Sequence, residues 1–343
     1  MALIVAGGTD NDPPPHGGDD LHRRGRNGRP CPARLSAMTS IDVRELTKEY
    51  GGRRVVDGLD FSVRPGRVTG FLGPNGAGKS TTFRLLLGLD RPTAGTATIG
   101  GEAYPRLREP LRRVGALLDA GAAHGSRTAR DHLLALAASN RVPARRVDTV
   151  LEETGLAAVA RRRVRTYSLG MRQRLGIAAA LLGDPEVVLL DEPANGLDPE
   201  GIIWIRALLR RLAAEGRTVL VSSHLMGETA AFADHLLILG RGRLLADTPV
   251  REFIHARVRP HVRIRTTDPA ALSDLLARHG HDASRDEAGT WIVRHTRVDD
   301  LGRLMSEAGV PVLELATREA TLEEAYLDLT ASETEFTAPP QEA

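Results

Sequence analysis

The chain has 343 residues, of which 41% are hydrophobic, so it is long enough for one large and one smaller domain and is not wholly disordered. Its 46 basic and 44 acidic residues leave a formal net charge of +2, which gives no reason to expect a nucleic-acid partner. The single cysteine, Cys31, excludes an internal disulfide framework and fits a reducing cytoplasm. No apolar run reaches the roughly 18–20 residues of a membrane helix.

The first 39 residues have little to bury. They are rich in Gly, Pro, Asp and Arg and include the run Pro13-Pro14-Pro15, a composition typical of disorder. Two interpretations stand for this segment. It is a disordered extension, or the start codon is assigned too far upstream and translation begins at Met38, just before the folded pattern.

The pattern of a folded protein begins at Ile41. Residues 41–46 and 53–63 alternate apolar and polar side chains, as half-buried antiparallel strands do. Residues 67–72 form a short apolar run that leads into a glycine-rich loop, and residues 80–89 have the apolar spacing of a helix. Residues 128–160 are predicted to be mainly helical.

The next segments predict a parallel sheet. Residues 186–190 and 218–222 are continuous apolar runs, which are typical of strands buried on both faces. Residues 236–240 and 243–246 predict a hairpin that closes this domain, which we place at residues 40–247.

A second pattern follows Pro249. Residues 250–331 predict the order strand, helix, two strands, helix and strand, which is the ferredoxin-like βαββαβ arrangement, with one helix appended. We therefore expect a small α+β accessory domain at residues 250–331. Residues 332–343 are predicted to be a polar tail.

A phosphate-binding loop lies between the predicted strand at 67–72 and the helix that follows. Its glycines let backbone N–H groups surround phosphate oxygens, and the helix N-terminus favours an anion. Only two of the 46 basic residues are lysines, a bias typical of a GC-rich bacterial genome. A lysine retained in this loop therefore indicates phosphate binding, for which its compact ammonium group is suited. The loop fits G-x-x-x-x-G-K-[ST] in full and consists of Gly73, Pro74, Asn75, Gly76, Ala77, Gly78, Lys79 and Ser80, with Thr81 next.

An acidic pair ends the strand at residues 186–190. In a parallel sheet this edge lies beside the phosphate-binding loop, so Asp191 is predicted to hold Mg²⁺ together with Ser80. The adjacent Glu192 is placed to polarise an attacking water. With the elements above, the two motifs predict an α/β P-loop NTPase core with an antiparallel β subdomain and a helical subdomain, plus the small α+β domain.

Several further features come in a fixed order along the chain. Tyr50 precedes the phosphate-binding loop, the segment YSLGMRQR begins at Tyr167, PANGLDP follows Glu192, and His224 follows the strand at 218–222. Across residues 40–247 the sequence therefore resembles the ABC ATPases.

The resemblance implies roles for these residues. Tyr50 matches the aromatic residue that stacks on adenine, and His224 matches the histidine that contacts the γ-phosphate. Ser168 and Gly170 match the signature segment, although Leu169 and Met171 replace its usual residues. The resemblance also implies that Asp198 lies in the turn that couples two ATP sites. The implied assembly is a head-to-tail homodimer in which ATP lies between the two chains.

One position departs from the family. ABC ATPases carry a glutamine between the phosphate-binding loop and the signature, but Asp119 stands in that place here. This feature is similar to the bacitracin- and lantibiotic-export branch, and a carboxylate there could still reach the metal or its water.

The function expected from the resemblance is hydrolysis of ATP, with Mg²⁺, to power a separate integral membrane permease. The chain would lie at the cytoplasmic face of a bacterial membrane, and the cargo would be a drug or peptide antibiotic. Two alternatives remain at this point: a soluble ABC ATPase that acts on a ribosome or nucleic acid, and an ATP-dependent sensory or immunity module without transport.

Overall fold

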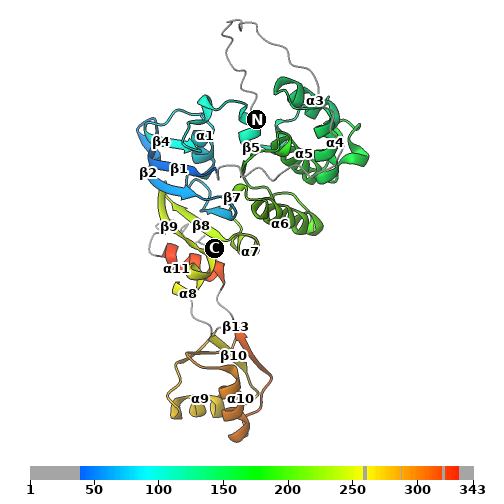
Figure 1. Cartoon of the computed structure of the whole chain (residues 1–343). Helices are drawn as coiled ribbons and strands as arrows, with labels where there is room; N and C mark the ends of the chain where they lie inside the picture. Colours follow the sequence, from blue (N-terminus) through cyan, green and yellow to red (C-terminus); the bar gives the residue numbers. More distant parts are fainter. Residues whose placement is uncertain (1–38, 258–260, 287, 319–320, 332–343) are drawn as a thin grey trace, which may run out of the picture. The chain divides into compact units, whose positions relative to one another are not determined.

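The computed structural model describes residues 39–257, 261–286, 288–318 and 321–331 (Figure 1). Residues 1–38 of the predicted N-terminal extension, with the start at Met38, and the tail at 332–343 lie outside these residues. The chain divides into two compact units, one of Met1–Val68 with Gly78–Ser222 and one of Thr69–Ala77 with Ser223–Ala343. None of the described helices has an apolar stretch long enough to cross a membrane.

A three-stranded antiparallel sheet opens the first unit. Strand β1 (Ile41–Tyr50) lies between β2 (Arg53–Val63) and β4 (Ala94–Ile99). Ile41 is in register with Val63 on one side and with Ile99 on the other. These three residues are fully buried, so the alternating pattern of residues 41–63 follows from one buried face.

Three strands of the first unit are parallel and mostly apolar. They are β5 (Val114–Leu117), β6 (Val187–Leu190) and β7 (Thr218–Ser223), in that order, within a six-stranded sheet. Nearly every residue in them is buried, which explains their continuous apolar runs. The helices α1 (Lys79–Leu86) and α6 (Pro199–Ala214) follow the phosphate-binding loop and Asp198 respectively.

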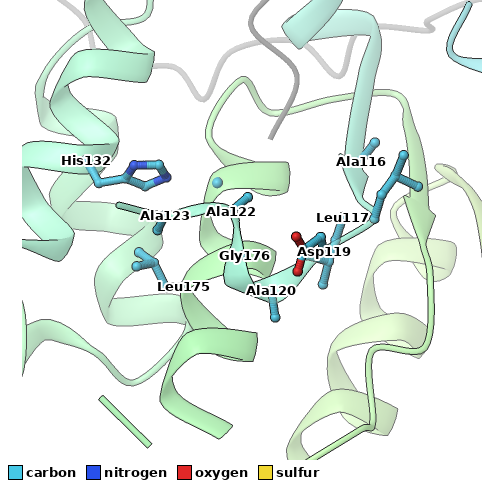
Figure 2. A pocket seen from close by; sticks show the side chains of 11 residues that line it. Ala116, Leu117, Asp119, Ala120, Ala122, Ala123, His132, Leu175 and Gly176 are labelled. Atoms are coloured by element: carbon cyan, nitrogen blue, oxygen red, sulfur yellow. The ribbon is translucent and has the colours of Figure 1, made fainter. Parts of the chain in front are cut away.

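The predicted helical region contains α3 (Ala129–Ser139) and α4 (Arg145–Glu153), which pack against each other and against α5 (Leu169–Leu181). His132 of α3 is 7% exposed and lines a pocket of about 10 Å³ with Leu175 (Figure 2). Its Nδ1 has no hydrogen-bond partner among the described residues. Burial lowers the pKa of His132, and the nearby Arg127 lowers it further.

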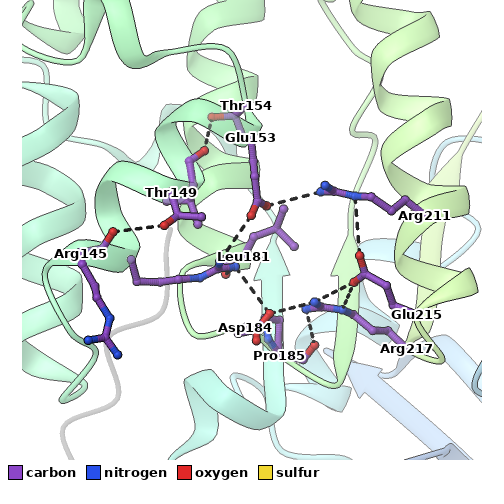
Figure 3. Close-up of polar contacts among 12 residues, drawn as sticks. Arg145, Thr149, Glu153, Thr154, Leu181, Asp184, Pro185, Arg211, Glu215 and Arg217 are labelled. Atoms are coloured by element: carbon purple, nitrogen blue, oxygen red, sulfur yellow. Dashed lines mark hydrogen bonds and ion pairs between the residues drawn. The ribbon is translucent and has the colours of Figure 1, made fainter. Parts of the chain in front are cut away.

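Ion pairs connect α4 with α6, through Arg211 and Glu153, and with the turn before β6, through Arg146 and Asp184 (Figure 3). The carboxylate of Glu153 lies 3.4 Å from both Arg146 and Arg211, and that of Asp184 lies 2.8 Å from Arg217. A single exposed pair contributes less than about 1 kcal/mol. Because the groups share partners, the network mainly fixes how these elements meet.

The second unit contains three further paired strands. In it β3 (Val68–Leu72) pairs in parallel with β8 (His235–Gly240), and β8 forms an antiparallel hairpin with β9 (Arg243–Pro249). Two short helices, α7 (Met226–Ala230) and α8 (Val250–Arg257), lie before and after this hairpin in the chain.

The C-terminal part of the second unit forms a four-stranded antiparallel sheet with the order β11-β12-β10-β13. It has its own core, which includes Val262, Leu272 and Leu301. Its elements follow the order βαββαβ and are β10 (His261–Arg265), α9 (Pro269–Arg278), β11 (Ala283–Arg285), β12 (Trp291–Arg294), α10 (Val298–Glu307) and β13 (Glu314–Arg318).

The appended helix α11 (Leu322–Ala331) contacts α7 and α8. Arg257 of α8 and Asp328 of α11 form an ion pair at 3.3 Å. The remaining helical segments are short and comprise α2 (Pro110–Arg113), η1 (Tyr104–Arg106), η2 (Ala120–Ala122), η3 (Ala157–Val159) and η4 (Val164–Thr166).

The closest packing around β5 yields a stability prediction. A Cβ added at Gly115 would lie 2.0 Å from the carbonyl oxygen of Ala180, so Gly115→Ala must move backbone and should cost about 1–3 kcal/mol. We expect a fall of several degrees in the thermal unfolding midpoint. Gly227→Ala is the control, because its Cβ would meet nothing within 4 Å. Equal midpoints for the two variants would contradict this account.

The buried His132 predicts a pH effect. Because its folded-state pKa is lowered, the unfolded state binds a proton first as the pH falls below about 6.5, and stability is lost there. Gln cannot take up this proton. The urea midpoint of His132→Gln should therefore fall less than that of the parent chain between pH 7.5 and 5.5. A parallel fall in both proteins would show that His132 does not contribute.

Candidate nucleotide site

The first part of the phosphate-binding loop is a tight turn after β3. A Cβ on Gly73 would lie 2.6 Å from the carbonyl oxygen of Leu239, so only glycine fits this close approach. The N–H of Ala77 donates to Pro74 O at 3.1 Å. Asn75 and Gly76 are exposed at the tip of the turn.

The second part of the loop begins the helix α1. Gly78 has φ 106° and precedes α1 without a side-chain cap, so the N–H groups of the first turn are suited to an anion. Lys79 is 7% exposed. Burial lowers the pKa of Lys79, while the charges of Glu192 and Asp191 oppose that change. The lysine and the acidic pair therefore belong to one electrostatic cluster.

Asp191 joins three elements of the first unit. Its Oδ2 accepts a hydrogen bond from Ser80 Oγ at 2.7 Å, and its Oδ1 accepts one from Ser222 Oγ. Its N–H donates to Leu117 O of β5 at 2.8 Å. The hydroxyl and carboxylate oxygens of Ser80 and Asp191 are of the kind that Mg²⁺ prefers.

Glu192 has an unusual backbone that is held at both ends. Its φ is +49°, which is uncommon for a residue other than glycine. Its N–H donates to Ser222 Oγ at 2.9 Å, and its carbonyl oxygen accepts from Gln173 Nε2 at 3.0 Å. Ser222 and Gln173 were not among the predicted site residues. The sequence feature that could have indicated Ser222 is its position as a polar residue at the carboxyl end of a buried strand.

Ser168 and Asp198 each cap a helix. Ser168 Oγ accepts from Met171 N at 3.2 Å at the start of α5, and Asp198 Oδ1 accepts from Gly201 N at 2.9 Å at the start of α6. Both side chains are exposed. Gly170 lies against the turn before Asp198, since its Cβ would be 2.9 Å from Gly196 O.

Tyr50 presents an open aromatic ring. The residue is 46% exposed, and its hydroxyl donates to Asp90 Oδ2 at 2.8 Å. The ammonium group of Lys48 lies 4.7 Å from the ring centre. Burial and the hydrogen bond to Asp90 raise the pKa of Tyr50. A ring oriented in this way can stack on a flat base.

Asp119 follows β5 and caps the turn η2, where its Oδ1 accepts from Gly121 N at 2.7 Å. Its side chain lies beside the pocket that His132 lines (Figure 2). Its proposed approach to a metal remains a prediction.

The predicted residues fall in both units. Lys79, Ser80, Asp191 and Glu192 belong to the first unit, while His224 belongs to the second together with residues 73–77. His224 is exposed, and the next residue, Leu225, donates its N–H to Ser223 Oγ at 3.0 Å. The catalytic role of His224 remains a prediction.

Two protein families match the chain. The family described as ABC transporter matches residues 56–195. A family described as a domain of unknown function (DUF8746) matches residues 260–323.

Two curated relatives match more than four fifths of this chain. The bacitracin transport ATP-binding protein BcrA of Bacillus licheniformis is 38% identical over 298 residues, which span 85% of this chain and 97% of that protein. The Nod factor export ATP-binding protein I of Burkholderia orbicola (strain AU 1054) is 37% identical over 305 residues, spanning 87% and 99%.

Solved structures share the fold. An ATP-binding subunit of an ABC transporter has a TM-score of 0.57 at 24% identity and covers 78% of this chain and 99% of its own. The cbiO1 protein of Clostridium perfringens, part of an ABC transporter complex, has a TM-score of 0.56 at 28% identity and covers 63% and 90%. On the sequence match to its curated relatives and the shared fold, this chain belongs to the ATP-binding, ATP-hydrolysing subunits of ABC transporters.

Proposed function

We propose that ATP hydrolysis by this chain powers the export of a drug or peptide antibiotic through a separate membrane permease, at the cytoplasmic face of a bacterial membrane. The printed names of two relatives refer to bacitracin transport and Nod factor export, and Asp119 is the feature that favours the antibiotic-export branch. The observation that carries the nucleotide chemistry is the contact between Ser80 and Asp191 beside Glu192.

The nucleotide would be held by the phosphate-binding loop. Backbone N–H groups of residues 73–81 would surround the phosphates, and Lys79 would place its ammonium group at the β- and γ-phosphates. Tyr50 would stack on the adenine. Ser80 and Asp191 fit Mg²⁺, because their oxygens already lie 2.7 Å apart. When bound, Mg²⁺ would neutralise charge on the phosphate oxygens.

Hydrolysis converts ATP and water to ADP and inorganic phosphate by in-line attack on the γ-phosphorus. Glu192 would polarise the attacking water and accept its proton, while His224 would orient the γ-phosphate. Lys79 would stabilise the charge that develops on the phosphate oxygens.

The complete site would be shared by two copies in a head-to-tail homodimer. Ser168 and Gly170 at the start of α5 would contact the γ-phosphate of ATP bound to the partner, since a helix N-terminus favours anions. Asp198 would lie at the contact between the two copies. The dimer would close with ATP and open after hydrolysis, and the permease would convert this cycle into movement of its cargo.

One prediction concerns the proposed base. Glu192→Gln keeps the shape of the side chain but removes the acceptor for the water proton, so steady-state ATP hydrolysis should fall at least about 100-fold. Bound ATP should then hold the dimer closed. Size-exclusion chromatography with and without Mg²⁺-ATP measures this change. A variant that hydrolyses ATP normally, or stays monomeric with ATP, would contradict the proposal.

Another prediction concerns Ser222, which is fully buried. Ser222→Ala removes the donor to Asp191 and the acceptor for the Glu192 N–H, and a hydrogen bond to a charged group is worth about 1.5–3 kcal/mol. We expect kcat to fall about 10- to 100-fold. Ser62→Ala is a matched control, because Ser62 donates to Asp42 at 2.7 Å in the three-stranded sheet. The control should retain kcat, and equal losses would contradict a specific role for Ser222.

A further inference from the structure

The first two turns of α5 lie along the segment that runs from Glu192 to Leu197. Gly170 approaches the end of this segment, since its Cβ would be 2.9 Å from the carbonyl oxygen of Gly196. The side chain of Leu169 also packs against Gly196, because a Cβ added to Gly196 would lie 2.3 Å from Leu169 Cδ2. Gln173 contacts the beginning of the segment. The signature helix therefore touches the acidic segment at both ends.

Gln173 makes the contact at Glu192. Its side chain is almost fully buried, with 4% of the residue exposed, and its Nε2 donates to Glu192 O at 3.0 Å. A buried amide without a hydrogen-bond partner is unfavourable. The buried Gln173 amide therefore favours a backbone conformation that keeps the carbonyl oxygen of Glu192 within reach. A side chain without an N–H donor at position 173 would remove this hydrogen bond, while the N–H of Asn195 would still donate to the same carbonyl oxygen at 3.2 Å.

Glu192 has a backbone conformation that needs such support. Its φ of +49° is uncommon for a residue with a side chain. Such conformations persist where the surroundings determine them, and they are frequent at active sites. The hydrogen bonds from Glu192 N–H to Ser222 and from Gln173 to Glu192 O hold the residue on both sides. Since the side chain leaves the backbone between these two bonds, they set its direction.

We propose that Gln173 is a positioning residue for Glu192, through which the signature helix orients the acidic side chain of its own site. The proposal rests on the role given to Glu192 under the proposed function. Ser168, at the N-terminus of the same helix, is proposed to serve the ATP bound to the partner. One rigid helix of 13 residues would then contribute to both shared sites of the dimer.

The test uses two neighbouring substitutions in the full chain. Gln173→Met has a similar volume but no donor, whereas the control, Arg174→Met, removes a donor to a different buried carbonyl, Thr154 O at 3.3 Å. We expect Gln173→Met to lower kcat at least about tenfold, with the KM for ATP changed less than about threefold. Arg174→Met should retain kcat within about twofold. Thermal unfolding of both variants measures the structural cost separately.

A double variant tests whether the effect passes through Glu192. In the Glu192→Gln background, Gln173→Met should not lower the residual hydrolysis further, and the ATP-bound dimer should still form on size-exclusion chromatography. A kcat for Gln173→Met equal to that of Arg174→Met would overturn the proposal. So would a double variant that hydrolyses ATP a further tenfold more slowly than Glu192→Gln alone. If Glu192→Gln itself hydrolyses ATP normally, the proposed function fails first, and the positioning role fails with it.

Discussion

The carboxylate of Asp191 accepts hydrogen bonds at both of its oxygens, from Ser80 at the start of α1 and from Ser222 at the end of β7. These bonds hold the end of β6 against the helix that follows the phosphate-binding loop. The register of the parallel strands makes this possible, because Leu190 of β6 lies opposite Val221 of β7. One further residue along each strand brings Asp191 beside Ser222. The position of Glu192 then follows from that of Asp191.

Local patterns predicted much of this arrangement. The continuous apolar runs at 186–190 and 218–222 became β6 and β7, and the phosphate-binding motif leads into α1. The matches to known proteins confirm the ABC ATPase fold and its ATPase function. The apolar runs and the phosphate-binding motif each depend on residues close together in the chain, where spacing and backbone geometry allow few alternative structures.

The residues that were missed depend on contacts between distant segments. Ser222 is 31 positions from Asp191 and Gln173 is 19 positions from Glu192. No periodicity indicates which strand register will form or which face of α5 will meet the acidic segment. Likewise, the contacts of α11 with α7 and α8 follow from tertiary packing and not from the βαββαβ pattern that precedes it.

The polar groups beneath the proposed site depend on one another. Lys79 is 7% exposed, Gln173 is 4% exposed and Ser222 is fully buried, and burial of such groups is unfavourable unless each has a partner. Ser222 and Gln173 find theirs on Asp191 and Glu192, and the acidic pair in turn supports the charge of Lys79. Loss of Ser222 or of Gln173 would therefore remove a hydrogen bond from the acidic pair. For that reason the chemistry and the local packing of this region are constrained by the same few hydrogen bonds.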